Sequence, residues 1–252
     1  MTKMNESEVK YLAGLLDADG SLSFKFCKTQ TGNTYCYLVL AITAVSHIDR
    51  KGYLLSLEKY GGKTIEYKNN AGNTAFKWQV QDRATLNKFL PRVLKHMVIK
   101  AKHWDTLFAA YTDLKGQDVT DKVEMLKALS TESRKNVGPL KAKNHPTWAW
   151  VAGYLDGDGC YTFAKRGEYG RTMHVGAIAH VDDVVALELL QKAFGGSLYE
   201  PQPDNTRLWR RGLGKTQKSF AIPFLRKVHR HSRLKGHKIE RMLEFLNSSR
   251  ND

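Results

Sequence analysis

Two aspartates, Asp19 and Asp158, occupy a setting in which a carboxylate could do chemistry. Each stands at the end of a predicted apolar helix and immediately before a glycine. A carboxylate placed there faces the negative end of the helix dipole, which costs about 0.3–1 kcal/mol. Carboxylate oxygens and the neighbouring backbone carbonyls of Ala18 and Gly157 suit Mg²⁺, which binds few protein ligands and completes its shell with water and phosphate oxygens. We therefore expect divalent metal at these helix ends, with Mg²⁺ as the cofactor and Mn²⁺ or Ca²⁺ as substitutes in binding.

Small residues recur on one face of both predicted helices. Gly14 and Ala18 lie four residues apart in the first helix, and Gly153 and Gly157 do so in the second. Residues four apart share a helix face, so two such helices can pack very closely. We expect this packing to bring the two aspartates together, where a bound cation makes their repulsion tolerable.

Both aspartates belong to an internal repeat that spans most of the chain. Residues 12–24 read Leu-Ala-Gly-Leu-Leu-Asp-Ala-Asp-Gly-Ser-Leu-Ser-Phe, and residues 151–163 read Val-Ala-Gly-Tyr-Leu-Asp-Gly-Asp-Gly-Cys-Tyr-Thr-Phe. Further matches follow in the same order at offsets of 131 to 139 residues: 46–49 with 179–182, 61–62 with 195–196, Trp78 with Trp209, and 89–100 with 224–235. The order and small drift of these matches predict a duplicated unit with pseudo-twofold symmetry.

Each repeat is predicted to contain the same α+β unit. Ser7 and Thr147 are suitable N-caps for the first helices, and Gly20 and Gly159 could end them in the left-handed conformation. Alternating apolar and polar residues then predict strands, and the order is helix, two strands, helix, two strands and helices, which indicates an antiparallel sheet covered on one face. In the first repeat we expect strands at 22–27, 35–43, 63–68 and 75–81, a turn at 31–33, and helices at 50–60, 85–96 and 100–115.

The duplication also sets the expected domain boundaries. One more helix is predicted at 121–135, and the Gly- and Pro-containing segment 136–146 is typical of a connector. We therefore predict an N-terminal half at 1–135, a linker at 136–146 and a C-terminal half at 147–252. The fold class is α+β with duplicated αββαββα units.

Composition narrows the class of partner. The chain has 252 residues, 40 Lys and Arg against 25 Asp and Glu, and a formal charge of +15. A polyanion is the natural partner, and nucleic acid is favoured over a membrane surface or a ribosome. The sequence has no apolar run approaching the roughly 20 residues of a membrane span, so no membrane association is expected. Cys27, Cys36 and Cys160 lack CxxC spacing, which favours a reducing, intracellular setting; an organelle matrix and a prokaryotic cytoplasm both fit.

A simple helix end and a calcium-binding loop are two alternatives to a catalytic metal site at the aspartate motif. An Asp-x-Asp-Gly sequence after an apolar helix is, by itself, typical of a helix stop followed by a turn. A calcium loop of the EF-hand type, counted from Asp17, would need glycine at position 6 and an acidic residue at position 12, where the chain has Leu22 and Lys28. The duplication of the motif within thirteen matching positions favours a functional site over both explanations.

Residues Leu12–Gly20 resemble the LAGLIDADG motif of homing endonucleases, and Val151–Gly159 resemble a looser copy. The resemblance implies a monomer that straddles double-stranded DNA with two curved sheets and makes a metal-dependent double-strand break at a long, pseudo-palindromic target, leaving short 3′ overhangs. It implies that Asp19 and Asp158 bind the catalytic metal and that Asp17 and Asp156 are structural. It also implies catalytic roles for Lys100 and Lys235, as basic residues that stabilise phosphate charge or polarise water. His47 and His180 lie where many relatives carry a polar residue that orients water, more commonly Gln, and are the remaining catalytic candidates.

The strand face opposite the apolar residues would then read DNA. Arg can pair with guanine and Gln with adenine, while most other Lys and Arg contact the phosphate backbone. Unequal reading faces imply a target that is only roughly palindromic. The expected DNA-binding residues are Ser23, Lys25, Cys27, Lys77 and Gln79 in the first half and Thr162, Lys165, Arg166, Arg171, Arg207 and Arg210 in the second.

Two other functions remain open at this point. An RNA-binding intron maturase could use the same scaffold, with the sheet or another basic face holding intron RNA. A DNA-binding protein with a silent active site is the second alternative. Retention of both aspartates and both lysines argues against the silent protein.

Overall fold

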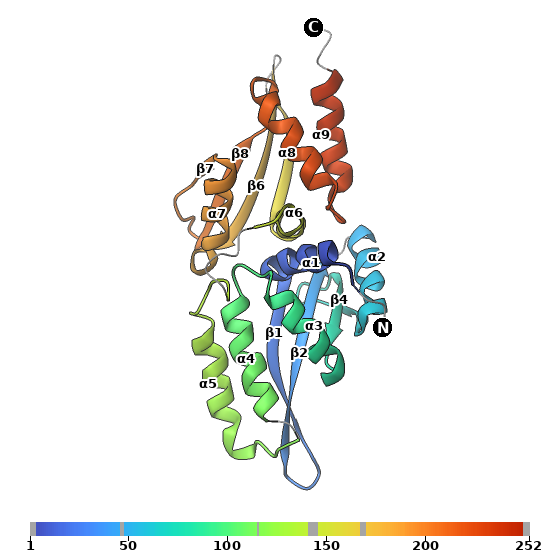
Figure 1. Ribbon diagram of the computed structural model, residues 1–252, viewed down its shortest axis with the longest axis vertical. Coiled ribbons are helices and arrows are strands. Elements are labelled where there is room, and N and C mark those ends of the chain that lie inside the picture. Colours follow the sequence, from blue (N-terminus) through green and yellow to red (C-terminus); the bar gives the residue numbers. More distant parts are fainter. Residues whose placement is uncertain (1–3, 46–47, 115, 141–145, 167–169, 249–252) are drawn as a thin grey trace. The chain divides into compact units, whose positions relative to one another are not determined.

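The computed structural model describes residues 4–45, 48–114, 116–140, 146–166 and 170–248 (Figure 1). Contacts divide the chain into two compact units. The first contains residues 1–9 and 19–144, and the second contains residues 10–18 and 145–252. The middle of the first helix therefore packs with the second unit, and the linker predicted at 136–146 stays a prediction.

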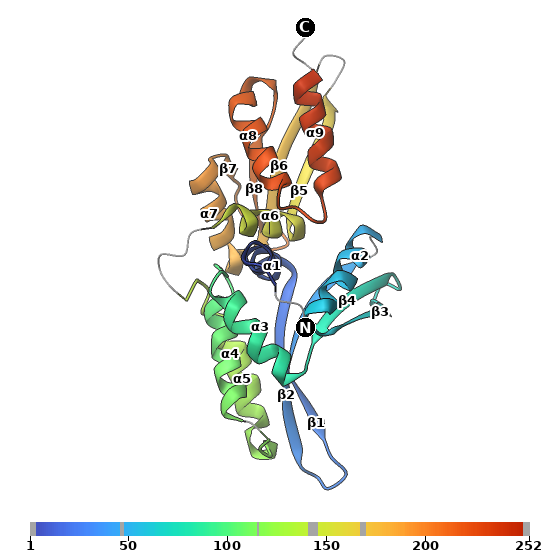
Figure 2. The same ribbon diagram turned by 45° about the vertical axis from the view of Figure 1, so that its right-hand side comes forward.

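The first unit is a four-stranded antiparallel sheet with helices on one face. Helix α1 (Glu6–Asp19) leads into the strands, whose order in the sheet is β1-β2-β4-β3. Helices α4 and α5 pack on β1, and α2 packs on β4 (Figure 2). The remaining elements are β1 (Gly20–Lys28), β2 (Thr34–Val45), α2 (Ile48–Leu57), η1 (Glu58–Tyr60), β3 (Lys63–Lys68), β4 (Thr74–Val80), α3 (Arg83–Leu94), α4 (Ala101–Asp113), η2 (Thr120–Lys122) and α5 (Val123–Ser133).

The second unit repeats this plan with the strand order β5-β6-β8-β7. Helix α9 packs on β5, and α7 packs on β6 and β8 (Figure 2). The predicted duplicated α+β fold is confirmed. The elements are α6 (Trp148–Gly157), β5 (Gly159–Arg166), β6 (Gly170–His180), η3 (Val181–Asp183), α7 (Val185–Phe194), β7 (Ser197–Leu198), β8 (Thr206–Gly212), η4 (Lys215–Gln217), α8 (Lys218–His229) and α9 (Gly236–Ser248).

Matching hydrogen bonds support the residue-level repeat. The indole Nε1 of Trp78 donates to the carbonyl of Gly61 at 3.0 Å, and that of Trp209 donates to the carbonyl of Gly195 at 2.9 Å. Both tryptophans are fully buried on the middle strands of their sheets. Two buried indole N–H groups therefore find partners at equivalent turns, as polar groups in a core must.

Strand register gives each sheet one apolar and one open face. Directly paired residues share a face, and Leu22 pairs with Leu40, which pairs with Val80, all of them buried. Helices cover this side of the sheet. On the opposite face β1 carries Ser23, Lys25 and Cys27, so the alternation predicted for this strand is confirmed.

Two details of the helix ends differ from the predictions. The side chain of Asn5, and not that of Ser7, accepts the Glu8 N–H at 2.8 Å at the start of α1, whereas Thr147 caps α6 as predicted. Gly20 and Gly159 each begin a strand, and neither has a positive φ. Gly159 is needed for a different reason, because a Cβ there would lie 2.4 Å from the Leu155 carbonyl oxygen.

Among the described helices, none has both the length and the apolar character needed to cross a lipid bilayer.

Candidate active sites at the two motif helices

Residues 10–18 of α1 pack against α6 through two glycines. A Cβ added to Gly14 would lie 2.0 Å from the carbonyl oxygen of Trp150, and one added to Gly153 would lie 2.0 Å from that of Tyr11. Backbone meets backbone at both places, so only glycine fits. The close helix contact predicted from the small-residue spacing is therefore present, and it has the symmetry of the repeat.

Buried side chains cross this helix pair in a reciprocal pattern. Tyr11 Oη donates to Asp156 Oδ2 at 2.8 Å, and Trp150 Nε1 donates to Asp17 Oδ2 at 2.8 Å. Tyr11 and Trp150 are repeat-equivalent, as are the two aspartates. Asp17 is 3% exposed and Asp156 is fully buried, so both carboxylates are structural groups that hold the helices in register.

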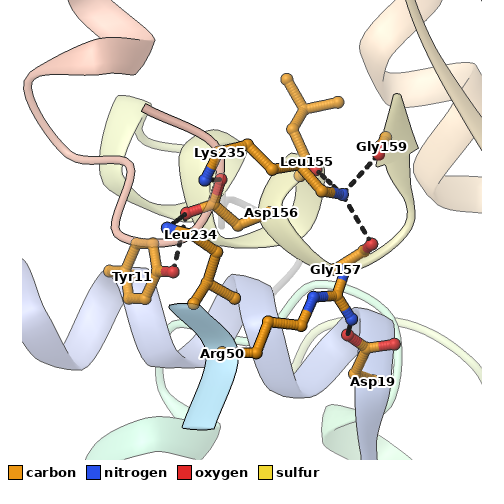
Figure 3. A network of polar contacts seen from close by, with 9 residues as sticks. All are labelled: Tyr11, Asp19, Arg50, Leu155, Asp156, Gly157, Gly159, Leu234 and Lys235. Carbon is orange, nitrogen blue, oxygen red and sulfur yellow. Dashed lines mark hydrogen bonds and ion pairs between the residues drawn. The ribbon is translucent and has the colours of Figure 1, made fainter. Parts of the chain in front are cut away.

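Asp156 also organises the turn that precedes α9 (Figure 3). Its two oxygens accept the backbone N–H groups of Arg233, Leu234 and Lys235 at 2.7, 3.0 and 3.2 Å, and the hydroxyl of Ser232 at 2.8 Å. Four donors here, in addition to Tyr11, satisfy the buried charge, and the N-terminal end of a helix favours a negative group. The network fixes the backbone from which the Lys235 side chain extends.

The Lys235 ammonium lies at the C-terminal end of α6. It donates to the carbonyls of Leu155 and Gly157, each at 2.9 Å, and to that of Gly159 (Figure 3). The last carbonyls of a helix have no partner within the helix and attract a cation. Lys235 thus places a positive charge on the backbone immediately before and after Asp158.

Lys100 makes the equivalent contact in the first unit. Its ammonium donates to the carbonyl of Gly20 at 3.1 Å, as that of Lys235 does to Gly159. Each lysine therefore contacts the residue that follows the motif aspartate. Lys100 and Lys235 therefore occupy equivalent positions in the two units, as the repeat predicted. Their role in catalysis stays a prediction.

Asp19 has an ion-pair partner that the sequence analysis missed. Arg50 Nη1 lies 3.6 Å from Asp19 Oδ2, with side chains that are 21% and 25% exposed (Figure 3). The repeat matches Asp49 with Asp182, so Asp183 takes the place of Arg50 in the second unit. Arg50 lies in α2 and Asp183 in η3, so the sequence alignment is the signal that could have indicated a difference in charge between the repeats.

The remaining predicted site residues lie as follows. Asp158 is half-buried, and its backbone N–H donates to the Tyr154 carbonyl at 3.0 Å at the end of α6. The Gly157 carbonyl, predicted to bind metal, accepts a hydrogen bond from Lys235. His180 is exposed at the end of β6, and His47 lies outside the described residues. Asp19 belongs to the first unit and Asp158 to the second, so their meeting, like the metal ligation by Ala18 and Gly157, stays a prediction.

The open face of the first sheet carries all five of its predicted DNA-binding residues. Ser23 pairs with Val39, Lys25 with Tyr37 and Cys27 with Tyr35, while Lys77 pairs with Thr43 and Gln79 with Ala41. All of these pairs have the parity opposite to the buried Leu22–Leu40–Val80 row. The shared face agrees with the prediction, which concerned DNA contact and stays untested.

The second sheet corrects one assignment. Thr162 and Arg210 lie on its open face, but Arg207 has the parity of the buried Trp209, pairs with the buried Ala179 and donates through Nε to the Tyr199 carbonyl at 3.0 Å. Residues three apart in a strand point to opposite faces, so the expectation that Arg207 and Arg210 share the open face was wrong, and DNA contact by either residue stays a prediction. The side chains of Lys165, Arg166 and Arg171 lie outside the described part of the chain.

These features define a class of protein: two repeats of one α+β unit, a close-packed pair of motif helices, and an aspartate and a lysine at the end of each helix. Residues 12–111 match the family model described as LAGLIDADG endonuclease, and this part of the chain belongs to that family. A comparison with curated proteins gave no match.

Solved structures of LAGLIDADG endonucleases share the whole fold. A double lysine-to-alanine mutant of I-SmaMI superimposes with a TM-score of 0.75 at 20% identity and covers 99% of this chain and 92% of that one. I-SmaMI bound to cleaved DNA gives 0.74 at 18% identity, covering 99% and 91%. I-GzeII in complex with its DNA target gives 0.71 at 13% identity, covering 98% and 92%.

Proposed function

We propose that this chain is a site-specific DNA endonuclease that makes a double-strand break at a long, pseudo-palindromic target and leaves short 3′ overhangs. The observation that carries the proposal is the retention, in both repeats, of a motif aspartate whose adjoining backbone is held by a lysine ammonium. The similar structures of I-SmaMI and I-GzeII contain DNA. The net charge of +15 supports the same partner.

The donors at each site fit a hard divalent ion that uses few protein ligands. Each helix end offers one carboxylate, and the Asp19 side chain is 25% exposed. The described residues contain no cluster of three or more His, Cys, Asp or Glu that would form an all-protein cage. Mg²⁺ suits such a site because it retains water and binds phosphate oxygens. I-SmaMI was also solved with uncleaved DNA and calcium ions.

Asp19 and Asp158 would hold the metal, which would activate water and neutralise phosphate charge when bound. The lysines contribute a fixed positive charge beside each site. Since Lys235 already donates to three carbonyls, its effect on a phosphate is electrostatic, and its hydrogen bonds also fix the backbone around Asp158. Prearranged charge of this kind stabilises a transition state without reorganisation at the moment of reaction.

Arg50 gives the first site a second positive charge. Its guanidinium pairs with Asp19. With a metal bound at that carboxylate, the guanidinium would add positive charge beside a phosphate, for which its planar donor group is well suited. In the sequence repeat Asp183 aligns with Arg50, so we expect this contribution at the first site and not at the second.

Cleavage of a randomised target library with Mg²⁺ tests the proposal, followed by assays on a supercoiled plasmid carrying a selected site. We expect linear product from the wild type, nicked or uncut plasmid from Asp19→Asn and Asp158→Asn, and none from the double variant. Asp121→Asn, an exposed aspartate in η2, is the matched control and should cut normally. Cutting that survives the double substitution would refute the assignment, and target binding without cutting by the wild type would favour a silent DNA-binding protein.

A further inference from the structure

One side-chain pair on the open face of the second sheet was not expected from the sequence. Arg210 Nη2 lies 2.9 Å from His174 Nδ1. His174 is on β6 and Arg210 is on β8, which neighbour each other in the sheet. Both side chains are half-buried. The pair lies on the face opposite to that of the buried Val175 and Trp209.

Two glycines make this contact available. Across the ladder, His174 pairs with Gly212, and Arg210 pairs with Gly176. The histidine and arginine therefore meet diagonally, over positions that carry no side chain. A Cβ at Gly176 would lie 3.1 Å from the Trp209 carbonyl oxygen and 3.2 Å from Cys160 Sγ, so this position is already crowded. Diagonal neighbours in an antiparallel pair are within reach of long side chains.

The hydrogen bond fixes the chemistry of both partners. Arginine can only donate, so Nδ1 of His174 is the acceptor and the neutral ring carries its proton on Nε2. Burial and the neighbouring Arg210 guanidinium lower the pKa of His174, which keeps the ring neutral at neutral pH. The histidine thus holds the guanidinium plane in one orientation, and Arg210 retains further N–H donors for a ligand.

We infer that Arg210, oriented by His174, reads a guanine in the half of the DNA target that the second sheet contacts. This inference deepens the proposed function and rests on it. Arginine pairs with guanine O6 and N7 through two parallel hydrogen bonds in the major groove. A guanidinium already held in place loses less side-chain freedom on binding, so the contact gains both affinity and selectivity.

The first sheet has a different pair of residues at the equivalent place. When the two sheets are aligned on Trp78 and Trp209, Gln79 of the first sheet corresponds to Arg210 of the second. Val39 likewise corresponds to His174. Glutamine selects adenine rather than guanine, and valine cannot accept a hydrogen bond. The guanine preference should therefore be present in one half-site and absent from the symmetry-related position of the other.

The test uses the full chain and a library of targets with each base pair randomised in turn. We expect the wild type to prefer G·C at one position by about 5- to 150-fold, the range of a bidentate contact. Arg210→Ala should remove that preference, and His174→Ala should reduce it at the same position by at least about threefold. His174→Asn, whose Oδ1 can replace the Nδ1 acceptor, should retain most of it. Arg226→Ala, an exposed arginine on α8, is the matched control and should leave every preference unchanged.

The outcomes separate this inference from the proposed function. Suppose that the wild type cuts selected targets but Arg210→Ala keeps every base preference, or that His174→Ala alters the preference at a different base pair. Guanine recognition by Arg210 and His174 is then overturned, while the proposed nuclease activity is supported. If the wild type binds targets without cutting, the same selection on bound DNA decides the matter, because the reading pair needs no catalysis. A chain that neither cuts nor binds DNA overturns both. Equal thermal midpoints of all variants exclude misfolding as the cause of a lost preference.

Discussion

Replacing Gly14 by alanine should damage the helix pair α1–α6 more than any single surface change. The new Cβ would lie 2.0 Å from the Trp150 carbonyl oxygen, 2.8 Å from its carbonyl carbon and 2.9 Å from the Tyr154 nitrogen. All three are backbone atoms, so relief requires the helices to separate by more than about 1 Å, given ordinary contact distances of about 3.5 Å. That movement would lengthen the 2.8 Å bonds to Asp17 and Asp156 beyond hydrogen-bonding range.

The expected loss follows from these contacts. Overpacking costs about 1–3 kcal/mol, and each charge-assisted hydrogen bond about 1.5–3 kcal/mol. The higher helix propensity of alanine returns about 1 kcal/mol. The net loss is about 3–8 kcal/mol, and even the lower value corresponds to a fall in Tm of about 6–12 °C for a chain of this size.

Thermal and urea unfolding measure this effect, with Gly52→Ala as the control. Gly52 is exposed in α2, and its added Cβ would meet open space, so that substitution should stabilise the protein by about 0.5–1 kcal/mol. Gly153→Ala should resemble Gly14→Ala, and the double variant should lose less than the two single losses together because one separation relieves both clashes. A Gly14→Ala protein as stable as Gly52→Ala would contradict the close backbone contact.

Four further predictions concern the site, the core and the partner. Lys235→Met should leave a plasmid nicked, whereas Lys238→Met, an exposed lysine in α9, should cut both strands, as gel assays of product can show. Asp156→Asn should lower the free energy of unfolding by about 3–5 kcal/mol, measured in urea, because the turn before α9 loses charged acceptors. Burial, with Arg134 and Lys100 nearby, lowers the pKa of His103 to about 4. The unfolded chain then takes up a proton that the folded protein does not, so the free energy of unfolding should be full above pH 6.5 and fall by about 2–3 kcal/mol between pH 6.5 and 4. A His103→Gln variant should lack this dependence. The logarithm of DNA affinity should fall with the logarithm of salt concentration, with a slope of about −0.9 for each phosphate neutralised. An affinity that does not change with salt would exclude DNA binding by the basic residues of the sheets.

The sequence alone determined the features that repeat or depend on local spacing. Both repeats carry the motif aspartate, the small residues and the later lysine at matched positions, and a helix converts a spacing of four residues into a shared face. The close contact at Gly14 and Gly153 and the equivalent backbone contacts of Lys100 and Lys235 were visible for this reason. Strand alternation likewise identified the open face of the first sheet.

Only the tertiary structure decided the pairings between distant residues. Arg50 beside Asp19 and the crossing of Tyr11 to Asp156 join residues from different elements, and no local period encodes such partners. Their spacing already separates Arg207 and Arg210, but only the register of β8 placed Arg210, and not Arg207, on the open face, since a one-residue shift reverses every side chain. The His174–Arg210 contact needed that same register, because two glycines clear a diagonal path only when they lie opposite these residues.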